Sequence, residues 1–484
     1  MPNSNADTAF FGHPRGLSTL FFTEMWERFS YYGLRAILLL YITAADGLGF
    51  SLAKGSAILA IYASMNYMLS LPGGWLADQF LGLRRAVIIG GLLIAAGNLS
   101  MTLAGEAPFY LGLALIIVGT GLLKPNVSTI VGTLYSKEDT RRDAGFSIYY
   151  MGINVGALLA PLIVGYVAQR INWRYGFAIS ALFMLIGVIQ FILESKHLPQ
   201  KIYQPVPPGT QLEQESRRRT LRFGGLGALA IVAILAIAQV NPEQIADLLG
   251  LGILALVIVV LGYLLFKGSP DANERRRLAV VCILFLISTV FWACFEQAAS
   301  TLNLFADKNT RNVVFGYEFP STWYQSLNSI FLIALAPFFA ALWVKLGDRQ
   351  PSVPAKFALG LVGVGLGFLI LVPAANLIPA SPLWLVALYL VHSMGELCLS
   401  PVGLSAMTRL APDRMGGFIM GVFFLSISAG NYIAGRVGGL YESLPLGTLF
   451  LYVALIPIAI AALFALVIKP VARMMETPAT ASNQ

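Results

Sequence analysis

The chain has 484 residues, of which 57% are hydrophobic and only 12% are charged, and its formal net charge is +8. Soluble proteins are usually about one-quarter charged, so this composition cannot cover a water-facing surface. It excludes a soluble enzyme, a disordered tail and a nucleic-acid-binding domain. Apolar stretches of about 20 residues recur along the chain, and each is long enough to cross a bilayer core of about 30 Å as a helix. The sequence therefore predicts an all-α polytopic membrane protein.

Fourteen membrane spans are expected, as twelve plus two. The first six lie near 16–43, 54–79, 84–104, 108–132, 144–167 and 175–194. A polar stretch, 195–220, precedes two apolar segments, 221–240 and 247–267, that are separated by a turn at Asn241-Pro242. The last six spans lie near 278–302, 321–345, 356–374, 382–409, 414–437 and 447–469. This order predicts three regions: a six-helix bundle over 1–194, a linker with an inserted two-helix hairpin over 195–275, and a second six-helix bundle with a tail over 276–484.

Positive charge sets the expected orientation. With the N-terminus in the cytoplasm, cytoplasmic segments hold 23 of the 32 Lys and Arg residues, external segments hold 6, and 3 lie within helices. This asymmetry places both termini of a multi-pass membrane protein inside the cell. The N-terminus is polar and the first apolar run continues into a full span, so we expect no cleavable signal peptide.

The two groups of six spans resemble each other weakly. Residues 149–161 align without gaps on 423–435, and Leu123-Lys124-Pro125 matches Leu399-Ser400-Pro401, at offsets of 274 and 276. Two matches in register favour duplicated halves, which is the architecture of secondary transporters. The alternative is chance similarity between helices that are rich in small residues.

Ionisable residues deep inside membrane spans are costly and indicate function by default. Seven are found here: Glu24, Glu27, Arg28, Arg35, Lys124, Glu296 and Glu396. Four of them lie on the first span, where positions 24, 27, 28, 31, 32 and 35 form one helical stripe. This stripe lines a cavity or packs against other polar helices. A purely structural ladder of ion pairs is the alternative, and it is strongest for Glu24 near the cytoplasmic end.

A glycine-containing turn links the second and third spans. Gly73-Gly74 is followed by Asp78 and then by Arg84-Arg85. Asp78 is expected to cap a neighbouring helix and to pair with the arginines. We interpret this turn, which resembles a loop motif of the major facilitator superfamily, as a gating loop on the cytoplasmic side.

Five motifs together resemble the proton-dependent oligopeptide transporter (POT) family of that superfamily. They are Glu24-x-x-Glu27-Arg28-Phe29-x-Tyr31-Tyr32, Gly119-x-Gly121-x-x-Lys124-Pro125-Asn126, Ile153-Asn154-x-Gly156, Trp323-Tyr324-Gln325-Ser326-Leu327-Asn328 and Gly395-Glu396-x-x-x-Ser400-Pro401-x-Gly403-Leu404. They follow in order from residue 24 to residue 404, each on the expected helix. The resemblance implies a major facilitator fold with two six-helix bundles plus an inserted hairpin, and symport of di- and tripeptides with protons.

The resemblance also implies roles for individual residues. Those that would meet the peptide carboxylate are Arg35, Lys124 and Tyr32, and those that would meet its amino group are Glu396, Asn154 and Asn328, with Ser400 in the same motif as Glu396. Residues that would shape side-chain pockets are Tyr31, Tyr67, Trp292 and Phe423, and those that would couple protons are Glu24, Glu27, Arg28, Lys124 and Glu296. A further expectation is that Lys124 is the partner of Glu296.

The chemistry of the charged residues independently suits a zwitterion. Arginine presents a planar donor fork to a carboxylate, lysine adds a point charge, and a buried glutamate can take an ammonium group. Two positions depart from the family pattern: Phe295 stands where many members have a second glutamate, and Phe423 stands where many have tryptophan. The first departure leaves the proton stoichiometry open, and the second leaves open which peptides fit.

Other classes of function fit the sequence less well. A proton-coupled drug antiporter or a transporter of a small anion such as nitrate is the alternative within the superfamily. Cys282, Cys294 and Cys398 lie in apolar stretches without metal-ligand spacing, so we expect no cofactor and no metal. His392 lies one turn before Glu396 and either pairs with it or only packs. The expected partners are di- and tripeptides, protons and the lipid bilayer, with no nucleic acid, and the expected state is a monomer.

Overall fold

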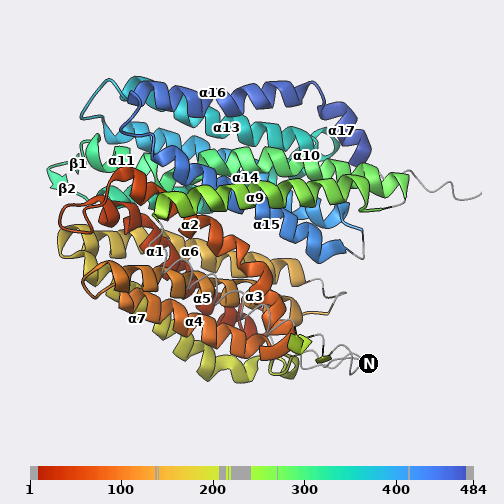
Figure 1. Cartoon of the computed structure of the whole chain (residues 1–484). Coiled ribbons are helices and arrows are strands. Elements are labelled where there is room, and N and C mark those ends of the chain that lie inside the picture. Colours follow the sequence, from red (N-terminus) through yellow and green to blue (C-terminus); the bar gives the residue numbers. More distant parts are fainter. Residues whose placement is uncertain are drawn as a thin grey trace, which may run out of the picture. The chain divides into compact units, whose positions relative to one another are not determined.

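The computed structural model describes residues 9–136, 139, 141–205, 214–215, 217–219, 241–269, 271–412 and 415–475, except for the side chains at 143 and 348. The expected span 221–240 and parts of the polar stretch 195–220 lie outside these residues. The described chain is almost entirely helical (Figure 1).

The first half of the chain follows the expected spans closely. Its elements are α1 (Gly16–Thr43), α2 (Leu52–Met68), α3 (Ser70–Leu76), the π-helical turn η1 (Ala77–Leu81), α4 (Leu83–Ser100), α5 (Glu106–Thr133), α6 (Arg142–Arg170), α7 (Trp173–Glu194) and the 3₁₀ turns η2 (Ser195–His197) and η3 (Gln200–Ile202). The second span is therefore not one continuous α-helix: it is interrupted at Leu69 and widens into the π-helical turn η1 before Gly82. Gly82 has a positive φ of 77°, which ends the turn and redirects the chain into α4.

The second half contains the remaining spans. Its elements are α9 (Pro242–Phe266), α10 (Ala272–Phe295), η4 (Glu296–Ala299), α11 (Thr301–Lys308), β1 (Val313–Val314), β2 (Tyr317–Glu318), η5 (Ser321–Trp323), α12 (Tyr324–Leu346), η6 (Gly347–Arg349), α13 (Val353–Ala374), α14 (Pro382–Leu410), α15 (Gly416–Gly438), α16 (Leu446–Ala465) and α17 (Ile468–Met475). The strands β1 and β2 form an antiparallel hairpin between α11 and η5. The expected span 278–302 is broken after Phe295, and 447–469 ends earlier and is followed by a separate short helix.

Within the described residues, eleven helical segments are long and apolar enough to cross a membrane. The helix α1 has the required length, at 28 residues, but it carries Glu24, Glu27, Arg28 and Arg35. The helix α2 has only 17 residues and is continued by α3. The total of fourteen stays a prediction, because the first helix of the expected hairpin lies outside the described residues.

The chain divides into two compact units. Unit 1 consists of residues 1–34, 68–160 and 171–248, and unit 2 consists of residues 35–67, 161–170 and 249–484. The C-terminal part of α1, almost all of α2 and the end of α6 thus group with helices from the second half of the chain. Backbone carbonyls explain this grouping: Asn303 donates to the Ala36 carbonyl at 2.8 Å, and Ser428 donates to the Ser64 carbonyl at 2.9 Å.

Unit 1 is held together by closely packed helices. α4 lies against α5 and α7, and a Cβ atom added to Gly97 would approach the Gly112 carbonyl oxygen to 2.6 Å. Small residues allow this close approach between membrane helices, where packing replaces the hydrophobic effect. The buried residues Leu123, Val127, Met184 and others fill the space between these helices.

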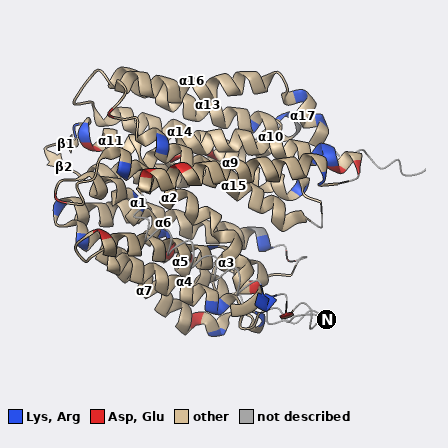
Figure 2. Cartoon of the chain, viewed as in Figure 1, with Lys and Arg blue, Asp and Glu red and all other residues tan. Residues whose placement is uncertain are grey.

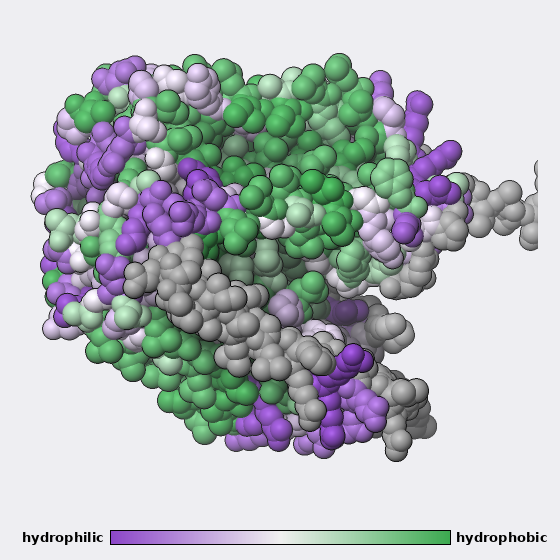
Figure 3. Space-filling model, viewed as in Figure 1, coloured by the Kyte–Doolittle hydropathy of each residue, from purple (hydrophilic) through white to green (hydrophobic). Residues whose placement is uncertain are grey.

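The helices of both units expose apolar side chains to their surroundings. Lys, Arg, Asp and Glu gather toward helix ends and connecting segments (Figure 2), and the visible flanks of the helices are largely hydrophobic (Figure 3). The helix α9 is typical: Leu248, Leu251 and Val259 are each about two-thirds exposed. A lipid-facing position for this helix explains both its exposure and the absence of charged residues from Leu248 to Phe266.

Candidate functional site

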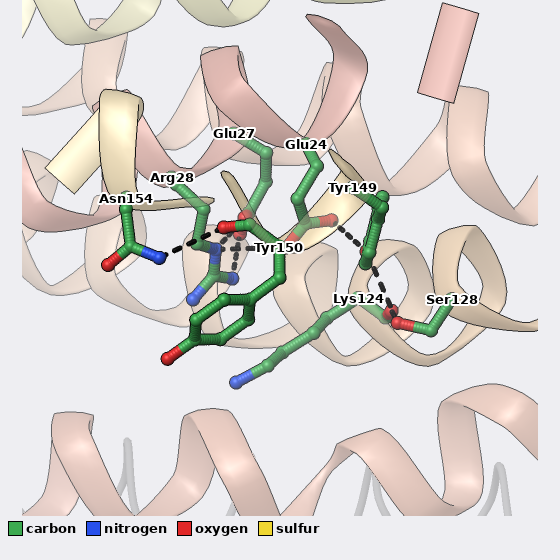
Figure 4. A network of polar contacts seen from close by, with 8 residues as sticks. All are labelled: Glu24, Glu27, Arg28, Lys124, Ser128, Tyr149, Tyr150 and Asn154. Carbon is green, nitrogen blue, oxygen red and sulfur yellow. Dashed lines mark hydrogen bonds and ion pairs between the residues drawn. The ribbon is translucent and has the colours of Figure 1, made fainter. Parts of the chain in front are cut away.

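Three charged residues of α1 form a buried cluster in unit 1. Glu24, Glu27 and Arg28 are at most 2% exposed. The guanidinium of Arg28 donates from Nη2 to Glu27 Oε1 at 2.6 Å and from Nε to Glu27 Oε2, and its Nε lies 3.3 Å from Glu24 Oε1 (Figure 4). One cation thus serves two carboxylates, so the predicted Glu27–Arg28 pair is present and Glu24 joins it.

Tyr149 extends this cluster and was missed by sequence reasoning. Its hydroxyl on α6 donates to Glu24 Oε2 at 2.6 Å, and Ser128 Oγ on α5 lies 3.2 Å from the same hydroxyl (Figure 4). Hydrogen bonds to ionised groups are short and strong, so Tyr149 compensates in part for the second carboxylate. The only sequence signal is a tyrosine pair in an apolar helix five residues before Asn154.

Lys124 and Asn154 lie beside the cluster. Figure 4 shows the Lys124 side chain extending from α5 toward the side on which the Arg28 guanidinium and the Tyr150 ring end. Asn154 on α6 donates to the Tyr150 carbonyl at 3.0 Å. The predicted residues Glu24, Glu27, Arg28, Lys124 and Asn154 are therefore brought together in unit 1.

The aromatic residues of the α1 stripe adjoin the same cations. The Arg28 guanidinium carbon lies 4.8 Å from the centroid of the Tyr31 ring, which is a cation–π distance. Tyr32 packs edge-on against Tyr31 with ring centroids 5.1 Å apart. Tyr67 at the end of α2 is half-buried and belongs to unit 2.

Unit 2 contains a second buried ion pair, between Arg35 and Glu296. Their side chains are 8% and 7% exposed, and Arg35 Nη2 donates to Glu296 Oε2. Our expectation that Lys124 is the partner of Glu296 is therefore wrong for this structure. The helix α10 ends directly before Glu296, and this break aims the carboxylate at the C-terminal part of α1.

Glu396 of α14 faces the same region of unit 2. Asn328 on α12 donates to Glu396 Oε2 at 2.9 Å and lies 3.1 Å from Ser393 Oγ. Arg35 and Glu296 both act on Glu396 electrostatically. The sequence-predicted residues Arg35, Glu296, Asn328 and Glu396 thus form one polar group in unit 2, to which Ser393 adds a contact that the sequence did not indicate.

His392 is not the partner of Glu396. Its Nε2 lies 3.1 Å from the Val364 carbonyl oxygen, and its ring packs against Phe368. Of the two interpretations left open by the sequence, packing is the one that the structure supports.

Comparisons with known proteins identify the family of this chain. The sequence profile of the POT family matches residues 84–452. The chain belongs to the POT family. An uncharacterized transporter of Bacillus subtilis is 45% identical over 481 residues, which cover 96% of both chains. A di-/tripeptide transporter of Lactococcus lactis subsp. cremoris is 38% identical over 495 residues, which cover 98% of this chain and 99% of that one.

Solved structures of POT-family transporters have the same fold as this chain. The crystal structure of a peptide transporter POT in complex with sulfate matches this chain with a TM-score of 0.93 and 40% identity, and the match covers 98% of each chain. The chain is thus a multi-span membrane transporter with the fold of the major facilitator superfamily, as the helix motifs indicated.

The remaining predicted pocket residues of this POT-family chain are packed inside unit 2. Trp292 is 8% exposed, and its Nε1 has no hydrogen-bond partner among the described residues. Phe295 packs against Trp292 with ring centroids 5.5 Å apart. Phe423 is 1% exposed and lies against Gly403, so its ring fills a packed position, whereas Ser400 on α14 is half-buried.

The gating loop of this POT-family chain differs from our expectation. Asp78 lies exposed in η1, and Gly82, the residue before α4, provides no side-chain cap. Arg84 donates from Nε to Ser195 Oγ at 3.0 Å and stacks over the Tyr203 ring at 5.1 Å, and Arg85 is exposed. In the described part of the chain the expected pairing of Asp78 with these arginines is not formed, because the segment that follows α7 takes the Arg84 side chain.

Proposed function

We propose that this protein is a proton-coupled symporter that imports di- and tripeptides by alternating access. In this proposal it catalyses no reaction, acts as a monomer and lies in the bacterial cytoplasmic membrane with both termini inside. Support comes from membership of the POT family, from a relative named as a di-/tripeptide transporter and from the match to a solved peptide transporter. The drug-antiporter and small-anion alternatives have no such support.

The observation that carries the proposal is the set of buried opposite charges in unit 2. Arg35 and Glu396 lie within electrostatic range of each other, and each has an exchangeable protein partner, Glu296 for the cation and Asn328 for the anion. A zwitterionic peptide supplies one carboxylate and one ammonium group. It can therefore replace both partners: its ammonium group pairs with Glu396 and its carboxylate pairs with Arg35, which leaves Glu296 without its cation.

The proposal assigns the groups of a bound peptide as follows. Its carboxylate is bound by Arg35, Lys124 and Tyr32, and its amino group by Glu396 with Asn154 and Asn328. Its side chains lie near Tyr31, Tyr67, Trp292, Ser400 and Phe423. Amide side chains bind the peptide backbone whatever the side chains are, so the proposal predicts broad sequence tolerance among short peptides.

Proton coupling is assigned to the carboxylates that share cations. The seven intramembrane charges consist of four glutamates and three cations, which leaves one excess negative charge. One proton makes this set neutral, whereas a zwitterion does not change its charge. When a peptide carboxylate pairs with Arg35, Glu296 loses its cation, and a proton can then neutralise it instead. Peptide binding and protonation are therefore linked in both directions. The Glu27–Arg28 pair is the second exchangeable pair.

Uptake of labelled dialanine into liposomes that contain the purified protein tests the proposal. An inward proton gradient should concentrate dialanine, and a cationic drug or nitrate should not compete. Amidation of the dipeptide C-terminus should weaken competition strongly in the wild type but only slightly in Arg35→Ala. The variant Arg15→Ala is a matched control, because Arg15 lies at the start of the same helix with its side chain 54% exposed. Equal losses on amidation in wild type and Arg35→Ala would remove Arg35 from the carboxylate site.

A further inference from the structure

The break between α10 and α11 has no local sequence cause. The segment Phe295-Glu296-Gln297-Ala298-Ala299-Ser300-Thr301 contains no proline and no glycine, and Glu, Gln and Ala favour helix. The α-helix nevertheless ends at Phe295, a 3₁₀ turn covers Glu296–Ala299, and Ser300 adopts φ −118° and ψ −97° before α11 begins. Interruptions of this kind need a side chain that replaces the lost backbone hydrogen bonds. The break must therefore be held by tertiary contacts.

The side-chain amide of Gln297 supplies these contacts. Its Nε2 donates to the Ala293 carbonyl at 3.0 Å and lies 3.4 Å from the Ala434 carbonyl oxygen of α15. Its Oε1 accepts from Ser300 Oγ at 3.0 Å and from Thr301 Oγ1. A primary amide offers two donors and two acceptor positions, and all four are used. Gln297 is 1% exposed, so no water competes.

Two adjacent residues, Glu296 and Gln297, join the break to two other helices. Ala293 lies in the last turn of α10, Ser300 and Thr301 begin the next segment, and Ala434 belongs to α15. Glu296, the residue directly before Gln297, reaches Arg35 on α1. Adjacent residues in the turn thus point to different neighbours, one to α1 and the other to α15.

We propose that Gln297 is a positioning residue for proton coupling: it holds the backbone of Glu296 at the break so that the carboxylate meets Arg35, and it ties this position to α15. The inference rests on the proposed function, in which Glu296 exchanges a proton. Gln297 itself touches neither peptide nor proton. It fixes where the titrating carboxylate lies, and a movement of α15 during transport changes the Arg35–Glu296 contact through it.

The test compares Gln297→Met, which keeps length and removes every hydrogen bond, with Gln190→Met. Gln190 is a half-buried glutamine of α7 in unit 1 that accepts a hydrogen bond from Thr23. Gradient-driven accumulation of dialanine by Gln297→Met should fall about tenfold or more, in the range typical of lost coupling between sites. Dialanine exchange without a gradient should stay within about threefold of wild type, and the pH profile of uptake should shift. Gln190→Met should leave accumulation, exchange and pH profile unchanged.

A double-mutant cycle with Glu296→Gln decides between positioning and general stability. If Gln297 acts through Glu296, adding Gln297→Met to Glu296→Gln should change accumulation and the pH profile no further. Additive losses, or parallel losses of exchange and accumulation that follow the unfolding temperature, overturn the inference. Should Gln297→Met fail to fold, Thr301→Val removes one of the four contacts and should show the same pattern to a smaller degree. A wild-type protein that moves no dialanine contradicts the proposed function instead, whereas an active wild type matched by Gln297→Met contradicts only this inference.

Discussion

Removal of Arg35 should destabilise the protein because it strands the buried carboxylate of Glu296, and a second substitution at Glu296 should restore the lost stability. Arg35 and Glu296 are both less than one-tenth exposed and pair with each other. Arg35→Ala leaves the Glu296 carboxylate buried, without its cation and close to the Glu396 carboxyl group. Breaking a buried ion pair on one side costs about 3–5 kcal/mol, because the remaining charge is uncompensated.

The expected shift in unfolding temperature follows from the size of the chain. Unfolding entropy is about 2 cal/mol/K per residue, so a chain of 484 residues shifts by about 1 °C for each kcal/mol. Arg35→Ala should therefore unfold about 3–5 °C below wild type. The double variant Arg35→Ala/Glu296→Gln removes the stranded charge and should recover most of this loss, although it should not recover peptide binding.

A thiol-reactive fluorescent dye can follow unfolding of the purified protein in detergent. Cys282, Cys294 and Cys398 are all free and buried, so dye labelling reports loss of the folded state without added probes. The control is Arg15→Ala, whose unfolding temperature should match wild type within about 1 °C, as is usual for an exposed charge. If the double variant is no more stable than Arg35→Ala, the stranded carboxylate is not the cause and the reasoning fails.

Four other outcomes are expected. Glu27→Gln should abolish accumulation of dialanine under an inward proton gradient but keep peptide-for-peptide exchange, and continued accumulation would move the coupling role to another carboxylate. Glu396→Ala should weaken dialanine binding at least tenfold, as loss of a buried charge partner does, measured by competition with labelled peptide; an N-acetylated peptide should bind both proteins alike. A cysteine placed at Glu215 should not be labelled by a thiol reagent applied to the outside of intact cells, because this segment is expected to be cytoplasmic. Gln169→Leu should increase external labelling of a cysteine introduced on α2 and slow uptake, whereas Arg170→Ala, which removes a partly exposed ion pair, should do neither.

The sequence contained enough to predict the helices and the α1 cluster, but not the partners of residues far apart in the chain. Glu24, Glu27 and Arg28 meet because helical spacing places them on one stripe, and spacing is a local property. Arg35 and Glu296 are 261 positions apart, and nothing in either motif distinguishes Arg35 from Lys124 as the partner. Packing of α1 against the break after α10 makes that choice.

The break itself also escaped prediction for a physical reason. Helix-breaking residues are visible in a sequence, but a break held by one glutamine depends on where another helix presents a carbonyl. Gln297 reads as an ordinary helical residue until Ala434 of α15 is placed beside it. Likewise, Asp78 and Arg84 are near neighbours in sequence, yet the position of Ser195 after α7 decides where Arg84 binds.

The contact between the end of α6 and the segment before α12 has a consequence for the medium in which the protein works. Gln169 binds Ser321 at 2.8 Å, Asp307 at 3.1 Å and Thr322 Oγ1 at 3.1 Å, and Gly165 lets the Thr322 side chain approach the helix closely. In the proposed orientation this contact lies on the outer side and consists of an amide, hydroxyls and a single carboxylate. Dissolved salt screens attraction between exposed charges but has little effect on neutral hydrogen bonds. The contact should therefore hold equally well in dilute and in saline surroundings.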